Sequence, residues 1–297
     1  MEALQKNGWT ARVVPVQRLD DAHGRVQAHL ASGELPRPAA DHLAQETIVT
    51  LPAEVPRPQA VVVAATRRPL TRAVVTVAGG EHVVPVPPHY AGYYSQPKRF
   101  EAALREALAP HGHMAALCQA PLKTLAAGTG LARYGRNNIA YIEGFGSYLL
   151  LAACVTDAAP PEDAVWGEAL QLERCERCSA CLRACPSGAI QEDRFLLHTE
   201  CCLTFMNESE APFPEWVDPG WHTCAVGCLR CQQVCPENAR VDLAVEPPER
   251  FDARETGAIL AGDQSMLSPA TREKLERCGL DYSAALIARN LQAMLGL

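Results

Sequence analysis

Residues 175–186 read Cys175-Glu-Arg-Cys178-Ser-Ala-Cys181-Leu-Arg-Ala-Cys185-Pro186. Three thiolates at this spacing can wrap a tight loop around one iron–sulfur cube, while the fourth starts a helix that points away and so ligates a second cube. Pro186 suits this turn because it fixes φ and removes a backbone donor near the sulfurs. The motif therefore predicts a domain of the bacterial ferredoxin type with two [4Fe–4S] clusters.

A second cysteine motif follows, Cys228-Leu-Arg-Cys231-Gln-Gln-Val-Cys235-Pro236. It lacks one leading cysteine, so the remaining ligand has to come from Cys201 or Cys202 upstream. Paired Cys-x-x-Cys motifs also suit a tetrahedral zinc site. The two interlocking Cys-x-x-x-Cys-Pro endings favour iron–sulfur clusters instead, because each ending can supply one cysteine to the other cube.

The distribution of cysteines indicates the compartment. Ten of the thirteen cysteines lie between Cys175 and Cys235, in a chain of 297 residues that is 48% hydrophobic. A secreted disulfide scaffold would be smaller and more evenly cross-linked, so metal ligation in a reducing compartment is favoured. No apolar run is long enough to span a membrane, and the first nine residues lack the apolar core of a secretory signal. We expect a cytoplasmic protein.

Charge is unevenly distributed along the chain. The formal net charge is −7, and residues 161–245 contain fourteen Asp or Glu, six Arg and no Lys. The cysteine-rich segment is therefore strongly acidic, while the rest of the chain is near neutral. A cationic stripe for nucleic acid is not predicted.

The hydrophobic pattern predicts an α+β protein with three parts. An α/β domain at 1–160 is followed by a linker at 158–162, a two-cluster domain at 161–245 and a helical extension at 246–297. Short β-branched or apolar runs predict strands, and apolar residues at helical spacing predict helices. Ser268 and Pro269 mark the start of a further helix. The strands are expected at 59–66, 73–80, 81–86 and 146–155, and the helices at 99–108, 121–130 and 282–295.

Three stretches resemble the epoxyqueuosine reductases, which are relatives of the cobalamin-dependent reductive dehalogenases. They are residues 122–138, residues 146–157, and the pair formed by 200–205 and 227–236. Alignment with the family places Cys202, rather than Cys201, on the ligand position. The resemblance then implies one cluster held by Cys175, Cys178, Cys181 and Cys235, and a second held by Cys185, Cys202, Cys228 and Cys231.

The resemblance also implies a function. The first domain would have a nitroreductase-like α/β fold that binds cobalamin, beside a ferredoxin-like domain. A donor such as ferredoxin or flavodoxin would deliver single electrons through the clusters to cobalt, and reduced cobalt would remove an epoxide oxygen or a halide. The protein would supply orientation and electrostatics, while the cofactors carry the chemistry.

A glycine-rich turn is the candidate corrin contact. The spacing Gly130-x-x-x-x-Gly135-Arg136-Asn137 superficially resembles a phosphate loop, but it lacks the Lys-Ser/Thr pair that nucleotide binding requires. A turn that approaches a large flat cofactor and a purely structural turn remain as alternatives. The candidate cofactor-binding residues are Gly130, Arg133, Gly135, Arg136, Asn137 and Asn138.

The sequence departs from the family at its catalytic aspartate. Residues 90–100, in the comparable place, contain no carboxylate, so Tyr93 or Tyr94 is the candidate proton donor. This departure and the acidic charge of residues 161–245 argue against tRNA as a partner. Two functions follow: an iron–sulfur reductase, which we favour, or an electron-transfer protein that serves a partner such as a corrinoid protein or another reductase.

Overall fold

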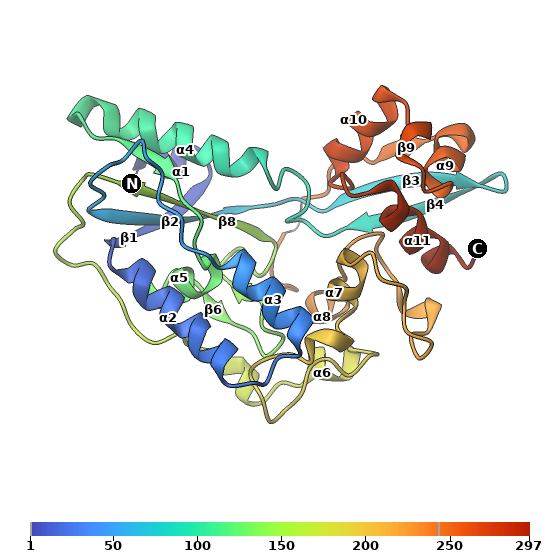
Figure 1. Ribbon diagram of the computed structural model, residues 1–297, viewed down its shortest axis with the longest axis horizontal. Coiled ribbons are helices and arrows are strands. Elements are labelled where there is room, and N and C mark those ends of the chain that lie inside the picture. Colours follow the sequence, from blue (N-terminus) through green and yellow to red (C-terminus); the bar gives the residue numbers. More distant parts are fainter. Residues whose placement is uncertain (1, 243) are drawn as a thin grey trace. The chain divides into compact units, whose positions relative to one another are not determined.

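The computed structural model describes residues 2–242 and 244–297 (Figure 1). Met1 and Leu243, which fall within the predicted domains 1–160 and 161–245, lie outside the described residues. The chain packs as two compact units. Unit 1 comprises Met1–Arg67, Tyr94–Ser179 and Glu192–Leu196, and unit 2 comprises Arg68–Tyr93, Ala180–Gln191 and Leu197–Leu297.

Unit 1 is built on a four-stranded antiparallel sheet in the order β1-β2-β8-β5. The central strand β2 is rich in valine, which suits a strand that is buried on both faces, and its residues 60–66 are all buried. The strands predicted at 59–66 and 146–155 are confirmed as β2 and β8. The bounds are β1 Trp9–Pro15, β2 Ala60–Arg67, β5 Ala115–Leu117 and β8 Leu149–Thr156.

Helices cover both faces of this sheet (Figure 1). Helices α1 (Glu2–Lys6) and α4 (Ser95–Leu108) pack against Val62 and Ala64 of β2. Helices α2 (Arg18–Ala31) and α5 (Leu122–Gly128) pack against the alternate residues of the same strand. Successive side chains of a strand point to opposite faces, so one apolar strand serves both cores. A further helix, α3, spans Arg37–Glu46.

A small hairpin completes unit 1. Strands β6 (Arg133–Tyr134) and β7 (Ala140–Tyr141) pair in an antiparallel manner, and residues 135–139 form the turn between them. Tyr134 also pairs with Gln171 in a parallel bridge. The segment that leads into the first cysteine motif therefore runs alongside this hairpin.

Unit 2 contains a three-stranded sheet in the order β4-β3-β9. Strands β3 (Thr71–Val77) and β4 (Gly80–Val86) form the predicted hairpin, and β9 (Glu249–Phe251) pairs with β3 in parallel. Because of this pairing, residues 68–93 pack with the C-terminal segment, which differs from the predicted boundary at 160. Helices α9 (Ala253–Leu260), α10 (Pro269–Cys278) and α11 (Ala284–Leu295) cover the sheet.

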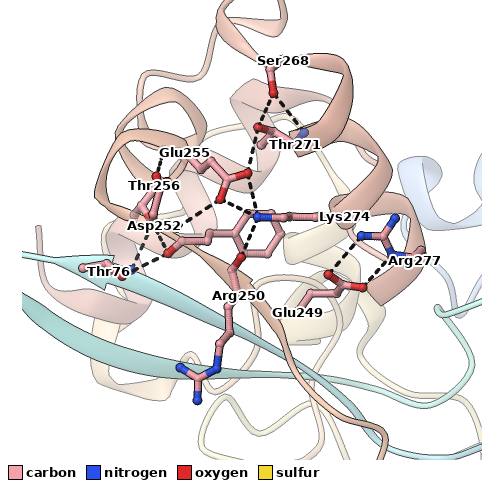
Figure 2. A network of polar contacts seen from close by, with 11 residues as sticks. Thr76, Glu249, Arg250, Asp252, Glu255, Thr256, Ser268, Thr271, Lys274 and Arg277 are labelled. Carbon is pink, nitrogen blue, oxygen red and sulfur yellow. Dashed lines mark hydrogen bonds and ion pairs between the residues drawn. The ribbon is translucent and has the colours of Figure 1, made fainter.

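A polar network holds the C-terminal helices to the strands (Figure 2). Lys274 Nζ donates to both carboxylate oxygens of Glu255, at 2.7 and 2.8 Å, and to the carbonyl of Arg250. Asp252 and Glu255 form a capping box at the start of α9. Ser268 caps α10, as predicted, by accepting from the Thr271 amide. The C-terminal segment is helical, as predicted, with the short strand β9 in addition.

The remaining elements of unit 2 are short helices that carry or border cysteines, which are α6 (Ala180–Ala184), α7 (Leu203–Glu208) and α8 (Arg230–Gln233). Helices α6 and α8 contact each other, and α7 contacts α11. The predicted α+β class is confirmed. In the described part of the chain, no helix is long and apolar enough to cross a membrane. Single turns of 3-10 helix occur at Ala109–His111, Glu173–Glu176, Thr199–Cys201, Pro219–Trp221 and Gln264–Met266.

Candidate functional site

The first cysteine motif is formed by consecutive short turns. Cys175 lies in the 3-10 helix Glu173–Glu176. Both Cys175 and Cys178 belong to unit 1. In unit 2, Cys181 lies in α6 and the amide of Cys185 donates to the carbonyl of Cys181 at 3.1 Å. Both short helices lack buried residues. The sulfurs of this motif are therefore presented by local backbone geometry rather than by a surrounding core.

The second motif is assembled from segments that are distant in sequence. Cys202 is the N-cap residue of α7, Cys231 lies in α8, and Cys235 follows α8. Cys228 comes directly after Gly227, which adopts a φ of 65°. A Cβ on Gly227 would lie 2.6 Å from the hydroxyl of Tyr90, so this position has no space for a side chain.

Three predicted ligands of the second cluster lie close together. The pKa of Cys202 is raised to about 11, mainly by burial and to a smaller extent by the neighbouring Cys228 and Cys185, although the amides of Phe205 and Thr204 that donate to its sulfur act to lower it. Burial also raises the pKa of Cys228, with an added contribution from Cys185. The structure thus gathers Cys185, Cys202 and Cys228 in unit 2, with backbone donors directed at the sulfurs of Cys202 and Cys228.

Cys201 and Cys224 are the two cysteines between residues 175 and 235 that are not among the predicted ligands. The pKa of Cys201 is raised by burial, by Glu200 and by Cys185, and no backbone donor to its sulfur contributes. Cys224 is 0% exposed, and burial raises its pKa to about 12. Cys185 is therefore near both Cys201 and Cys202, but the amide donors of Cys202 are not reproduced at Cys201. This favours Cys202 as the upstream ligand.

The chemistry of these donors fits an iron–sulfur cluster. All thirteen cysteines are free thiols. Among residues 2–242 and 244–297, no three Cys, His, Asp or Glu side chains are arranged to hold a single metal ion. Soft thiolates with backbone N–H donors are the ligands that such clusters use. The donor set and the hydrogen bonds to sulfur therefore fit a cluster.

An apolar group shields the second motif. Leu203, Met206 and Val217 are buried together, and Phe213, Trp221 and Cys228 pack against them. His222 is 6% exposed and packs on Phe213, with 4.5 Å between ring centroids. Neither nitrogen of His222 has a hydrogen-bond partner among the described residues. Burial, aided by Arg289, lowers the pKa of His222, which keeps the ring neutral at pH 7. Sequence reasoning did not single out this histidine.

Helix α11 secures the backbone of the second motif. Asn290 is 0% exposed and donates to the carbonyls of Asn207, at 2.8 Å, and Ala225, at 2.7 Å. Arg289 donates to the carbonyls of Met206 and Ala211, and its guanidinium stacks over Phe213 at 4.1 Å. One turn of α11 therefore fixes both the helix that follows Cys202 and the segment that precedes Cys228.

The predicted cofactor-binding turn is engaged with protein atoms. Arg133 pairs with Glu173 at 3.0 Å, and Arg136 donates to the carbonyls of Cys175 and Glu192. Asn137 is 2% exposed and donates to the Tyr141 hydroxyl at 2.9 Å. The backbone shows why the turn has this sequence, since Gly130 and Asn138 adopt φ of 69° and 58°. The structure thus brings this turn to the first cysteine motif, a contact that the sequence did not predict.

The two candidate proton donors lie at the surface. Tyr93 and Tyr94 are 49% and 71% exposed. The neighbouring Tyr90 is buried instead and donates a hydrogen bond to Glu208. Burial, with the nearby carboxylate of Glu208, raises the pKa of Tyr90 well above its ordinary value. Tyr90 is thus neutral and structural, whereas Tyr93 and Tyr94 are exposed to solvent.

Comparison with known proteins agrees with this geometry. Residues 174–238 match the family described as "4Fe-4S double cluster binding domain". An epoxyqueuosine reductase from Synechococcus sp. is 35% identical over 141 residues, which cover 44% of this chain and 40% of that protein. One from Pseudomonas aeruginosa is 33% identical over 132 residues, covering 43% and 35%. The matched segments thus span well under half of these relatives.

A solved structure extends the likeness to the whole fold. Epoxyqueuosine reductase from Streptococcus thermophilus superimposes with a TM-score of 0.66 at 15% identity, covering 99% of this chain and 79% of that one. At this identity the likeness concerns the fold alone. The match over residues 174–238 decides between the two metal alternatives, because its description is of 4Fe-4S clusters rather than zinc.

Proposed function

We propose that this chain, a distant relative of the epoxyqueuosine reductases, is an iron–sulfur oxidoreductase that passes single electrons through two [4Fe–4S] clusters. The observation that carries the proposal is the grouping of Cys185, Cys202 and Cys228, with backbone amides directed at the sulfurs of Cys202 and Cys228. Such donors stabilise thiolate over thiol, which is the form that binds iron. In this proposal, residues 161–245 form a ferredoxin-like domain that holds both clusters.

The ligand assignment follows the interlocking of the two motifs. One cluster takes Cys175, Cys178, Cys181 and Cys235, and the other takes Cys185, Cys202, Cys228 and Cys231. When bound, the clusters supply one-electron transfer at potentials that the protein sets through charge, hydrogen bonds to sulfur and solvent exposure. The contacts of α11 and the packing of Leu203, Met206 and Val217 hold the second motif, and Cys228 packs against this group.

The electron acceptor implied by the resemblance is cobalamin, bound by a nitroreductase-like first domain for a reductive deoxygenation or elimination. The predicted corrin contacts fit such a ligand only in part: Arg133 and Arg136 are bound to protein atoms, whereas the buried Oδ1 of Asn137 has no hydrogen-bond partner among the described residues. Tyr93 and Tyr94, whose phenols are exposed, are the groups proposed to donate a proton to a reduced substrate.

A second candidate is an electron-transfer protein that relays electrons to a separate reductase or corrinoid protein. It is favoured by the segment 90–100, which has no carboxylate, and by the bound state of the turn side chains. In either function, the electron donor would be a small redox protein such as ferredoxin or flavodoxin, and the acidic charge of residues 161–245 disfavours tRNA.

Anaerobic reconstitution with iron and sulfide, followed by titration with cobalamin, tests both functions. The reductase predicts about eight irons per chain and a change of the cobalamin absorption spectrum that marks tight binding. Two reducible clusters without any change of the cobalamin spectrum would leave only electron transfer. A chain that takes up no stoichiometric iron would overturn both proposals.

A further inference from the structure

The turn after β6 makes an unexpected bond to the first cysteine motif. The backbone N–H of Arg136 donates to Sγ of Cys175 at 3.4 Å. Through its guanidinium, Arg136 also donates to the carbonyl of Cys175 and, at 3.3 Å, to that of Glu192. One residue therefore places both an amide dipole and a cation beside the same cysteine.

The amide of Arg136 has little freedom to turn away. The amide of Gly135 donates to the carbonyl of Ile139 at 2.8 Å, and the amide of Asn138 donates to the carbonyl of Gly135 at 2.9 Å. A Cβ on Gly135 would lie 2.4 Å from Oδ1 of Asn137 and 2.6 Å from the ring of Tyr141. The two hydrogen bonds fix the peptide that precedes Arg136, and with it the direction of the N–H group, and only glycine fits at position 135.

The cysteine is fixed from its own side. The amide of Tyr134 donates to the carbonyl of Leu170 at 2.9 Å, and the amide of Leu172 donates to the carbonyl of Tyr134 at 2.8 Å. The amide of Cys175 then donates to the carbonyl of Leu172 at 2.9 Å. Because the strand that starts the turn also pairs with the segment that carries Cys175, the two groups meet in a set register.

Hydrogen bonds to a ligand sulfur and positive charge near a cluster both stabilise the more negative, reduced state. The acidic background of residues 161–245, with fourteen acidic residues and six arginines, acts in the opposite direction and disfavours the reduced state, so the Arg136 cation offsets part of it. We propose that Arg136 is a positioning residue that raises the reduction potential of the first cluster through Cys175. This inference rests on the proposed function, since it takes Cys175 as a cluster ligand.

The test is an EPR-monitored redox titration of the reconstituted full chain, with iron and sulfide content measured on every sample. Arg136→Gln keeps the backbone N–H but removes the charge and the guanidinium bonds. Arg136→Lys keeps the charge. Arg133→Gln is the matched control, because Arg133 is on the same hairpin and its ion pair with Glu173 is exposed.

We expect Arg136→Gln to hold as much iron as the wild type, and to disfavour reduction of one cluster by about tenfold, a downward shift of about 59 mV. Arg136→Lys should recover part of the shift, and Arg133→Gln should leave both potentials unchanged. Repeating the titration in the Cys202→Ala background, where only the first cluster is expected to remain, assigns the shifted signal.

Two results would overturn the inference. One is an Arg136→Gln protein with unchanged potentials at both clusters. The other is an equal shift in Arg133→Gln, which would indicate a general charge effect. If Arg136→Gln loses a cluster, the reduction potential of the first cluster in Arg136→Lys decides. A lower potential than in the wild type supports the inference, and an unchanged potential overturns it. A wild-type chain without clusters would refute the proposed function itself, and iron content separates that failure from the others.

Discussion

The two cysteine motifs present the same kind of ligand with very different structural support. In the first, the 3-10 helix with Cys175 and the helix α6 contain no buried residue. In the second, Cys202 starts a helix that buries Leu203, Met206 and Asn207, and Ala225 and Val226 near Cys228 are 0% exposed. Local turns and the hydrogen bonds from Arg136 hold the first motif, whereas the second depends on a packed core.

This difference arises because the second motif lacks one leading cysteine and takes its remaining ligand from a segment upstream. A complete Cys-x-x-Cys-x-x-Cys run closes around a cube within one loop, so little else has to be fixed. When one ligand comes from a distant segment, the protein has to order both segments against their conformational entropy. Helix α11 does this, because Asn290 bonds to the backbone of both segments. The consequences for each motif can be measured separately.

The largest expected effect is at Cys202. Cys202→Ala should lose about half of the cluster iron, because the second cube loses its upstream ligand, whereas Cys201→Ala should keep all of it. Iron and sulfide analysis after anaerobic reconstitution measures the difference. Similar losses in both variants would mean that the two adjacent thiols are interchangeable, and the assignment of Cys202 would fail.

The next effect concerns the support of the second motif. Asn290→Ala leaves the carbonyls of Asn207 and Ala225 buried without a donor, which should cost about 3 kcal/mol of unfolding free energy. Anaerobic urea denaturation followed by circular dichroism measures this cost. Gln292→Ala is the control, because its bond to the Leu260 carbonyl is exposed and its loss should cost under about 0.5 kcal/mol. Equal losses of unfolding free energy in the two variants would mean that Asn290 of α11 does not support the second motif.

Part of this architecture could be read from the sequence. The cysteine spacing, the valine run of β2 and the Ser268-Pro269 helix start are local signals. The structure confirms the strand β2 and the start of helix α10. The packing of residues 68–93 with the C-terminal segment could not be predicted, because β9 is three residues long and has no readable periodicity. Backbone donors such as the Arg136 amide leave no trace in residue identity at all.

The candidate site shows the same division. The cysteines were found because their chemistry and spacing are both specific. His222 was not, because a lone histidine is common in cores and only its lack of a hydrogen-bond partner among the described residues distinguishes it. The turn 135–138 was noticed for its glycine and asparagine, but its contact with Cys175 depends on the pairing of Tyr134 with residues 170–172. Tertiary pairing of this kind has no local signature.

A pH effect tests the core that backs the second motif. Cys278 is 0% exposed in the core that contains Ala225 and Val226, and burial raises its pKa from 9.0 to about 12. The unfolded thiol ionises first, so this stabilisation is complete below pH 9 and is lost as the pH rises toward 12, at about 1.4 kcal/mol per pH unit.

The stability of the wild type should therefore fall by about 1.4 kcal/mol more than that of Cys278→Ala between pH 7 and pH 10. Urea denaturation at the two pH values measures the difference. Cys278→Val, which also lacks the thiol but fills the space differently, should show the same reduced pH dependence. If all three proteins lose the same stability, the Cys278 thiol does not titrate as its burial requires.

The smallest effect is expected beside the first motif. Arg133 and Glu173 form an ion pair at 3.0 Å, but their side chains are 45% and 85% exposed. Screening by water therefore leaves the pair only a small contribution to the free energy of unfolding. Arg133→Ala should change the unfolding free energy by under about 0.5 kcal/mol, and should not change the iron content. Urea denaturation and iron analysis measure both quantities. The segment that leads into the first motif is held instead by the backbone bonds of Tyr134 to Leu170 and Leu172, which this substitution keeps. A loss of 2 kcal/mol or of one cluster would mean that the first motif depends on this exposed ion pair as strongly as the second depends on its core, and the contrast would disappear.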